Sequence, residues 1–432
     1  MGAAYTVHPS KLRIGFVSTR LGTTDGVSLE TEKWTHVLTG LGHQCFFFAG
    51  LCDRPPEVSY VVPEAHFTHP SILQTYNLAF NSRNRPPKLT RQIQELAQYL
   101  KQHLYDFAKK YEINMLIVEN ALAIPLNIPL GIAITEFIAE TGMNTIAHHH
   151  DLYWERRRFL VNCVWDYLDM SFPPRLPSIR HIVINSPAAA QLSYRRGISA
   201  RLIPNVMDFG HPPPPPDDYA STVRADLRID ADEYLFLQPT RVVRRKGIEH
   251  AIELVRRLPL PARLVITHAS GDEGDAYEKH IRSFSQLLDT STIFVSDIIS
   301  DKRGTTPDGR KIYSLWDVYP FADIVTYPSL LEGFGNAFLE AVYFRRPIVV
   351  NDYTIYAIDI KPKGFKAIEL DGFITAEAVT RVEQILRKPA MAAEMAEHNY
   401  QLAKRFYSFV FLEHQLQGLL QSFTGEDVRS YP

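Results

Sequence analysis

Two glutamates that flank a pair of glycines give the strongest chemical signal in the chain. Glu332 and Glu340 lie eight residues apart in EGFGNAFLE, and Gly333 and Gly335 follow the first of them. Glycines let backbone N–H groups approach a ligand closely, and a helix N-terminus offers free donors and a partial positive charge to a phosphate. A carboxylate can accept hydrogen bonds from two sugar hydroxyls at once. The segment could therefore bind a sugar phosphate; the alternative is an ordinary helix start with both glutamates in solvent.

A basic turn supplies the complementary charges. Arg241 and Lys246 lie five residues apart in TRVVRRKG, directly after an apolar run of strand length. Both side chains could hold a diphosphate, the arginine as a planar fork and the lysine as a point charge. We expect Arg244 and Arg245 to be solvated, and a fully solvated basic turn is the alternative for the whole segment.

Three consecutive histidines form a further cluster. His148, His149 and His150 follow another short strand-like run and precede Asp151. Three histidines could indicate a metal site, but neighbouring positions point in different directions and no partner with a ligand spacing such as HExxH is present. The sequence therefore predicts no metal site here.

The turn after the first apolar run is rich in small and polar residues. It reads GTTDGVS over residues 22–28 and could approach a phosphate, although a βα turn of this kind needs no ligand. It does not match GxGxxG, which disfavours an NAD-dependent dehydrogenase.

The elements that must position these groups alternate along the chain. Short apolar runs are separated by helical stretches in both halves, which is typical of parallel sheets covered by helices on both faces. The strand candidates lie at residues 12–17, 44–48, 114–118, 144–147 and 181–184 in the first half and at 234–237, 263–267, 293–295, 324–327 and 347–350 in the second. The pattern predicts an α/β fold with two Rossmann-like domains.

A proline run separates the two halves. Residues 211–218 read HPPPPPDD, and five consecutive prolines can continue neither a helix nor a central strand. We expect a first domain over 1–210, a linker over 211–218 and a second domain over 219–404, with a C-terminal helix near 405–432 that packs back on the first domain. Because ligands of open α/β sheets bind at the carboxyl ends of the strands, we expect the active site in a crevice between the two sheets.

Length and composition narrow the class of protein. The chain has 432 residues, 45% of them hydrophobic, which suits two domains better than one core. A formal net charge of -2 argues against a general nucleic-acid binder. Cys45, Cys52 and Cys163 form no CxxC pair and fit free thiols in a reducing compartment. The start shows no signal-peptide pattern and prolines interrupt the most apolar window, so we expect a cytoplasmic protein without an integral membrane segment.

Motifs in the second half carry a resemblance to a known family. An RxxxxKG segment at residues 241–247 is followed by PSxxEGFGxxxxE at 328–340 and preceded by IPNxxD at 203–208. In this order and spacing they resemble the family 4 retaining glycosyltransferases. That resemblance covers nearly the whole second half and implies the GT-B fold, in which two Rossmann-like domains face each other across a cleft. The sequence departs from the family pattern after residue 350, where NDYTIYAID replaces a Gly-Gly turn.

The resemblance implies a role for each motif residue. Arg241 and Lys246 would neutralise the departing donor diphosphate, and Glu332 would hold hydroxyls of the donor sugar. Glu340 would hold the nucleotide ribose. His150 fits best as a further catalytic residue beside the donor sugar, although His148 or His149 could serve instead. The donor would also contact the glycine-rich turns, namely Gly26, Gly333, Phe334, Gly335 and Asn336.

The segment after the histidines bears on the acceptor. DGVS together with HHHDLYWERRRF resembles synthases of small solutes such as mannosylglucosylglycerate. Asp25, Tyr153, Arg156 and Arg157 are therefore candidates for acceptor binding, with the arginines suited to a carboxylate or phosphate. A solvated helix face is the alternative for the arginines.

Together these signals predict a retaining glycosyltransferase. It would move a hexose, mannose or glucose, from a nucleotide diphosphate sugar to a hydroxyl of a small sugar-containing acceptor, and GDP-mannose and UDP-glucose both fit as donors. No cofactor is required, and a divalent metal is not expected to be essential, because cationic side chains already face the diphosphate. The alternatives are a disaccharide phosphorylase or sugar-nucleotide epimerase on the same fold, and a non-catalytic nucleotide- or carbohydrate-binding protein.

Overall fold

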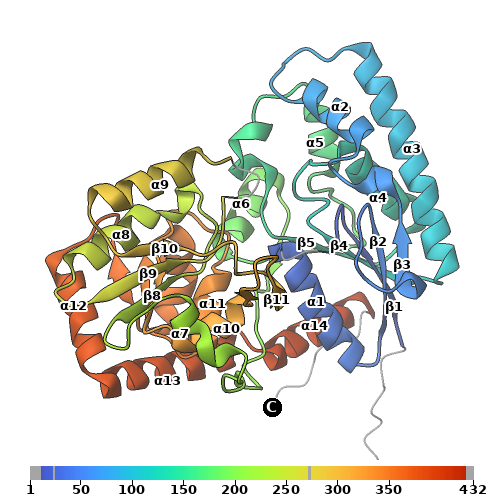
Figure 1. Ribbon diagram of the computed structural model, residues 1–432. Helices are drawn as coiled ribbons and strands as arrows, with labels where there is room; N and C mark the ends of the chain where they lie inside the picture. Colours follow the sequence, from blue (N-terminus) through green and yellow to red (C-terminus); the bar gives the residue numbers. More distant parts are fainter. Residues whose placement is uncertain (1–10, 23–24, 271–273, 425–432) are drawn as a thin grey trace, which may run out of the picture. The chain divides into compact units, whose positions relative to one another are not determined.

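The computed structural model describes residues 11–22, 25–270 and 274–424. The chain divides into two compact units: unit 1 comprises the residues up to Pro204 together with those from Leu412 onward, and unit 2 runs from Asn205 to Phe411. Each unit has its own parallel sheet and its own helices (Figure 1). The predicted α/β class with two Rossmann-like domains is confirmed.

The chain enters unit 2 before the proline run. The backbone N–H of Met207 donates to the carbonyl of Tyr407 at 2.8 Å, and the Tyr400 hydroxyl donates to the carbonyl of Phe209 at 3.1 Å. Both Met207 and Phe209 are buried. Residues 211–218, where we expected the interdomain linker, therefore lie within unit 2, because the apolar residues ahead of them already belong to its core.

Unit 1 is built on a sheet of seven parallel strands among the described residues. Their order is β3-β2-β1-β4-β5-β6-β7, so it reverses between β1 and β4. The strands are β1 (Arg13–Val17), β2 (Gln44–Ala49), β3 (Ser59–Val61), β4 (Met115–Glu119), β5 (Thr145–His149), β6 (Ile179–Val183) and β7 (Ala200–Leu202). Every residue of β4 is buried, which explains why this strand reads as an unbroken apolar run.

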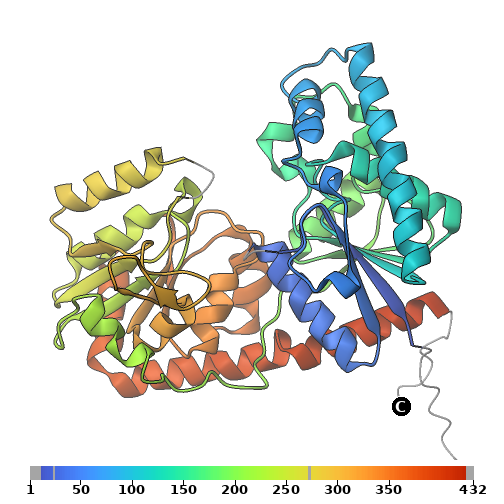
Figure 2. The same cartoon turned by 45° about the vertical axis from the view of Figure 1, so that its right-hand side comes forward.

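Helices cover both faces of the unit 1 sheet. Helix α1 (Gly26–Gly40) lies on one face, and α3 (Pro87–Lys110) and α4 (Ile128–Thr141) lie on the other (Figures 1 and 2). Phe107 of α3 and Val118 of β4 share one core with α4. Further helices of unit 1 are α2 (Pro70–Ala79), α5 (Trp165–Ser171), α6 (Ser186–Arg196) and α14 (Phe409–Thr424).

The C-terminal helix α14 belongs to unit 1 from Leu412 onward. Leu412 and Leu416 are fully buried, and Arg201 Nε donates to the side-chain oxygen of Gln415 at 3.1 Å. We expected a helix near 405–432 to pack on the first domain; of that range, the described part that belongs to unit 1 begins at Leu412.

Unit 2 contains a sheet of six parallel strands in the order β10-β9-β8-β13-β14-β15, counted over the described residues. The strands are β8 (Tyr234–Gln238), β9 (Ala262–Ile266), β10 (Thr292–Phe294), β13 (Ile324–Tyr327), β14 (Ile348–Asn351) and β15 (Ile368–Leu370), with a separate antiparallel pair of β11 (Gly304–Thr305) and β12 (Lys311–Ile312). The order reverses between β8 and β13. In open α/β sheets such a reversal marks where ligands bind, at the carboxyl ends of the strands.

The helices of unit 2 complete its layers. Apolar residues of α8, α9 and α12 pack with those of β8, β9 and β13 in one core. The helices are α7 (Val223–Asp226), α8 (Ile248–Arg257), α9 (Ala276–Leu287), α10 (Leu315–Val318), α11 (Asn336–Tyr343), α12 (Ala376–Arg387) and α13 (Pro389–Phe406). This core fixes the central strands, and hence the loops that leave their carboxyl ends.

Candidate active site

The basic turn and the EGFG loop follow the two central strands of unit 2. The turn leaves β8 and the loop leaves β13, so both lie where the strand order reverses. The backbone N–H of Leu330 donates to the carbonyl of Arg245 at 2.8 Å. Gly247 has a φ of +57°, and a Cβ there would lie 2.6 Å from the Pro328 carbonyl oxygen. A glycine is therefore required for the two segments to approach this closely.

This close approach brings Lys246 and Glu332 together. Lys246 Nζ forms an ion pair with Glu332 Oε1, and Arg245 Nη1 lies 3.2 Å from Glu332 Oε2. The Lys246 and Glu332 side chains are 11% and 9% exposed, so the pair is largely desolvated. Arg244 is exposed as expected. Arg245, which we expected to be solvated, is 36% exposed and only partly so, because a short 3₁₀ turn directs its side chain toward the β13 loop.

Positive charge exceeds negative charge around this pair. Burial lowers the pKa of Lys246; Glu332 opposes this effect, and Arg245 and Arg241 reinforce it. Burial would raise the pKa of Glu332, but Lys246 and Arg245 outweigh it and hold this pKa below its usual value. Glu332 is therefore ionised beside Lys246 and Arg245, and the exposed Arg241 acts on Lys246 from the same turn. Such a cluster favours a further anion such as a diphosphate.

His268 extends the cluster at the carboxyl end of β9. Its Nδ1 lies 2.7 Å from the Thr267 hydroxyl. Burial lowers the pKa of His268, opposed by Asp301 and reinforced by Arg241 and Lys246. Sequence reasoning did not single out His268; its position directly after a predicted strand is the signal that could have found it.

The second glycine of the EGFG loop shapes the start of α11. Gly335 has a φ of +136°, and a Cβ at this position would lie 2.5 Å from the Tyr353 hydroxyl oxygen. The same hydroxyl donates to the Phe334 carbonyl at 2.8 Å. The Phe334 ring is buried against Tyr407, so its backbone rather than its ring is available to a donor, whereas Gly333 is exposed. Tyr353 lies in NDYTIYAID, where the sequence departs from the family pattern, and its support of the loop was not predicted.

Asn336 and Glu340 on α11 each have a partner within unit 2. Asn205 Nδ2 donates to Asn336 Oδ1 at 2.8 Å, across 131 residues of sequence. The buried Tyr319 hydroxyl donates to Glu340 Oε2 at 2.8 Å. The IPNxxD and EGFG motifs are thus in direct contact, and both predicted donor-binding side chains of α11 are held in place.

In unit 1, a glutamate of β4 contacts two of the three histidines. Glu119 Oε2 lies 3.0 Å from His148 Nδ1 and 3.1 Å from His150 Nε2. Side chains two residues apart on a strand share a face, so His148 and His150 meet the same carboxylate, whereas His149 points to the other side. We predicted no metal site from the sequence, because neighbouring positions point in different directions and no short ligand motif accompanies the histidines. The structure supplies the missing partner from the adjacent strand, and the three residues offer ligand atoms within 4.8 Å of one another.

His150 is fixed by both its ring and its backbone. Burial would raise the pKa of the fully buried Glu119, but His148 and His150 lower it to about 2. Burial would lower the pKa of His150, but the hydrogen bond with Glu119 prevails and raises it. Asn120 Oδ1 accepts from the His150 backbone N–H at 3.1 Å, and Asn120 Nδ2 donates to Asp151 Oδ1 at 3.1 Å.

The third histidine has a separate partner. His149 Nε2 and His181 Nδ1 lie 2.9 Å apart in a buried contact between β5 and β6. Burial lowers the pKa of His181 from 6.5 to about 4.

We expect the protein to lose stability as the pH falls from 6.5 toward 4. The unfolded chain then gains a proton on His181 that the folded chain does not bind, so the loss is absent above pH 6.5 and complete near pH 4. A shift of this size corresponds to roughly 3 kcal/mol. Urea unfolding of the wild type and His181→Gln at about pH 7 and about pH 5 measures the effect. The variant should show the smaller decline; equal declines would contradict the assignment.

Asp25 and Gly26 begin α1. Asp25 Oδ1 accepts hydrogen bonds from two backbone N–H groups of the helix, each at 3.1 Å, and Arg20 lies 3.2 Å from its other oxygen. Asp25 is therefore the N-cap of α1, and Gly26 is the first helical residue. Residues 23–24 of the predicted glycine-rich loop lie outside the described residues.

The remaining acceptor candidates divide between interior and surface. Tyr153 is buried in the core, with its ring centre 5.0 Å from that of Trp154. Arg156 Nε donates to Asp151 Oδ2 at 2.6 Å, which places this arginine beside the histidine turn. Arg157 is exposed.

Comparison with known proteins decides the class. The chain is 30% identical over 441 residues to the mannosylglucosylglycerate synthase of Thermotoga maritima, covering 93% of this chain and 98% of that protein. It is 32% identical over 386 residues to the mannosylglucosylglycerate synthase of Petrotoga mobilis, covering 83% of this chain and 86% of that protein. The chain belongs to this glycosyltransferase family. No protein-family model matches it.

Solved structures give the fold of this glycosyltransferase. A glycosyltransferase from Rickettsia africae ESF-5 superimposes with a TM-score of 0.69 at 12% identity, over 97% of this chain and 100% of that one. Anabaena HepE in complex with UDP-glucose superimposes with a TM-score of 0.64 at 12% identity, over 95% of this chain and 100% of that one. The predicted GT-B fold is confirmed, and the relatives above confirm the glycosyltransferase class.

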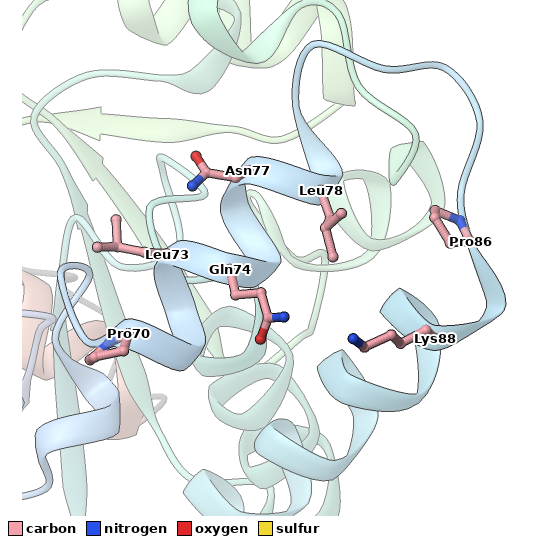
Figure 3. Close-up of a pocket in the computed structure, with 7 residues that line it drawn as sticks. All are labelled: Pro70, Leu73, Gln74, Asn77, Leu78, Pro86 and Lys88. Carbon is pink, nitrogen blue, oxygen red and sulfur yellow. The ribbon is translucent and has the colours of Figure 1, made fainter.

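A surface hollow of the glycosyltransferase lies on unit 1 between α2 and the start of α3 (Figure 3). It is lined by Pro70, Leu73, Gln74, Asn77, Leu78, Pro86 and Lys88. Lys88 is the only ionisable residue in this lining, so the hollow lacks the paired charges of the clusters described above.

Over the described ranges, no helix of the glycosyltransferase is both long enough and apolar enough to cross a bilayer.

Proposed function

We propose that this enzyme transfers a hexose from a nucleotide diphosphate sugar to a hydroxyl of a small, acidic, sugar-containing acceptor, with retention of the anomeric configuration. The observation that carries the proposal is the pairing of Lys246 and Arg245 with Glu332, with Arg241 acting on Lys246, where the strand order of unit 2 reverses. The relatives' product name, which unites mannose, glucose and glyceric acid, supports the acceptor class. We therefore favour mannose as the transferred sugar and a glucosylglycerate as the acceptor, with glucose as the second candidate donor sugar.

Donor binding follows from the charges of unit 2. Lys246 and Arg241 would pair with the diphosphate, and Glu340 would accept hydrogen bonds from the ribose hydroxyls. Both oxygens of Glu332 already face cations, but a carboxylate has about four lone-pair sites, so each oxygen can still accept a sugar hydroxyl. The backbone of Gly333–Asn336 at the start of α11 would approach the sugar and phosphate. HepE, which has this fold, was solved with UDP-glucose.

Charge on the leaving group is the main demand of the reaction. As the bond between the anomeric carbon and the phosphate oxygen breaks, the acceptor oxygen bonds to that carbon on the same face. The acceptor proton passes to the departing phosphate oxygen, so no separate general base is needed. Cations fixed in a site of low solvent exposure stabilise that developing charge strongly. Lys246 is such a cation, and the exposed Arg241 adds a second positive charge. We therefore propose that turnover needs no divalent metal and persists in a chelator.

Unit 1 would hold the acceptor. His150 remains our candidate for contact with the transferred sugar, and Arg156 and Arg157 are the candidates for the acceptor carboxylate. Asp25 would affect acceptor binding indirectly. Its side chain caps α1 and so fixes the start of this helix. The free cysteines support our further proposal of a reducing, cytoplasmic compartment.

We expect Arg157→Ala to raise the KM for the acceptor with little change in kcat. A hydrogen bond to a charged group contributes about 1.5–3 kcal/mol, which corresponds to an increase of about 10–100-fold. Initial rates with varied acceptor and saturating donor measure it. Arg387→Ala, an exposed arginine of α12, is the control and should leave the KM unchanged. An unchanged KM in both Arg156→Ala and Arg157→Ala would remove these arginines from the acceptor site.

The experiment that tests the proposal is a thermal-shift panel with UDP, GDP, ADP and their sugar conjugates, on the wild type and on Arg241→Ala. A ligand that binds only the native state raises its melting temperature by mass action. We expect one nucleotide to stabilise the wild type and to lose this effect in the variant, which would also identify the donor. If no nucleotide stabilises the wild type, the proposal fails, and inorganic phosphate and free sugars become the ligands to test for a phosphorylase.

A further inference from the structure

A buried carboxylate and two imidazoles converge at the carboxyl ends of β4 and β5 in unit 1. Glu119 is the last residue of β4, and it pairs in register with His148 of β5. Its Oε2 lies 3.0 Å from His148 Nδ1 and 3.1 Å from His150 Nε2. Glu119 and His148 lie on two adjacent strands of the sheet, and His150 is the residue directly after β5.

The side chains of the cluster are largely buried, and within the described part of the chain some of their polar atoms lack hydrogen-bond partners. The Glu119 side chain is 0% exposed and that of His148 is 1% exposed. Glu119 Oε1 and His148 Nε2 have no hydrogen-bond partner among the described residues, and His148 Nδ1 contacts only the Glu119 carboxylate there. The Trp34 ring stacks on the His148 ring with centres 4.3 Å apart and covers that side. Buried polar atoms without partners are costly, and an ionised carboxylate in such a place requires a positive charge beside it.

We propose that Glu119, His148 and His150 bind a divalent transition-metal ion. Imidazole nitrogens suit zinc, cobalt and nickel, whereas magnesium and calcium prefer sites made of oxygen. Two donor atoms bound to one ion at about 2.0–2.2 Å each lie about 3–3.6 Å apart, which the two contacts to Glu119 match. The ion would supply the positive charge that the carboxylate requires and would lie between Glu119 Oε2 and His148 Nδ1.

The proposed metal ligands and the proposed donor-binding cations belong to different units of the chain. All three ligands lie in unit 1, whereas the cations that act on the diphosphate lie in unit 2. Coordination through Nε2 of His150 leaves its Nδ1 for another contact. His150 also keeps the greatest side-chain exposure of the three ligands, at 9%, and is therefore the side from which an ion would enter. The inference does not rest on the proposed function, because metal binding is measured without any substrate.

Cobalt(II) is the most direct probe, because its visible absorption reports the ligands around it. The full chain is stripped with a chelator, titrated with Co²⁺ and then with Zn²⁺. We expect one ion per chain, a visible spectrum typical of nitrogen and oxygen ligands in a low coordination number, and displacement of cobalt by zinc. A wild type that gives no such spectrum overturns the proposal, and shows that a proton on an imidazole neutralises Glu119 instead.

Ligand variants locate the ion. His150→Gln changes the most exposed ligand, and Glu119→Gln keeps the shape of the carboxylate. Loss of a residue that only supports a metal ligand typically weakens metal binding about 10–100-fold. Each of these variants changes a ligand itself and should weaken cobalt binding by more than that. His398→Gln, an exposed histidine of α13, is the matched control and should bind cobalt as the wild type does. If a ligand variant fails to fold, as judged by circular dichroism, the other one decides. Wild-type affinity in folded ligand variants would place the ion elsewhere and overturn the assignment.

Discussion

Replacing Lys246 with alanine is expected to lower the turnover number by about 10²–10³-fold, the usual effect of losing one group that stabilises charge in a transition state. Lys246 is buried, lies at the carboxyl end of β8, and contacts Glu332. Its charge is therefore fixed beside the position proposed for the departing diphosphate. The measurement is kcat at saturating donor and acceptor, with circular dichroism and a melting curve to show that the variant is folded.

Two comparisons separate this effect from a general loss of structure. Arg244→Ala removes an exposed cation from the same turn and should retain most of the activity. Lys246→Ala should also lower the melting temperature, because removal of one partner of a buried ion pair is destabilising, but Arg245 still neutralises Glu332. A folded Lys246→Ala variant with wild-type turnover would show that this lysine does not act on the leaving group.

Replacing Gly335 with alanine should abolish most activity and destabilise unit 2. The φ of +136° is a conformation that residues with a side chain rarely adopt, and such strain costs of order 1–3 kcal/mol. In addition, the new Cβ would lie 2.5 Å from the Tyr353 hydroxyl oxygen. The loop must therefore move, and with it the N-terminus of α11 and the backbone proposed to contact the donor. Urea unfolding and kcat/KM for the donor measure the two effects.

The Tyr353→Phe background separates the steric overlap at Gly335 from the backbone strain. Removing the hydroxyl relieves the steric overlap but not the backbone strain, so Gly335→Ala should cost less stability in Tyr353→Phe than in the wild type. Tyr353→Phe alone loses the hydrogen bond to the Phe334 carbonyl, a cost of about 0.5–1.5 kcal/mol. If Gly335→Ala lowers the free energy of unfolding equally in both backgrounds, overlap with the Tyr353 hydroxyl does not cause the destabilisation.

Much of the fold could be predicted because its strands are apolar and buried. Runs such as β4, in which every residue is buried, are visible in the sequence without any knowledge of their neighbours. The candidate site could be predicted from the sequence for a related reason. Arg241, Lys246 and Glu332 lie in the loops that follow two strands. In a parallel sheet the carboxyl ends of neighbouring strands lie at one edge.

Contacts between distant segments could not be predicted in this way. Arg245 was expected in solvent because the turn that directs it toward Glu332 exists only in the fold. Glu119 was missed because it meets His148 across two strands rather than through a short motif. Tyr353 was missed because it supports Gly335 from a segment without a recognisable pattern. The unit boundary was misplaced because a proline run is a conspicuous signal, whereas packing of Phe209 against Tyr400 is not.

The most direct test of the central claim is the anomeric configuration of the product. The enzyme is incubated with glucosylglycerate and α-linked GDP-mannose, and in parallel with α-linked UDP-glucose, and the anomeric proton and carbon of the new sugar are examined by NMR. We predict a single α-linked product from one of the two donors and none in the Lys246→Ala variant under the same conditions. A β-linked product would contradict retention, and the absence of product from both donors would contradict the proposed transfer to this acceptor.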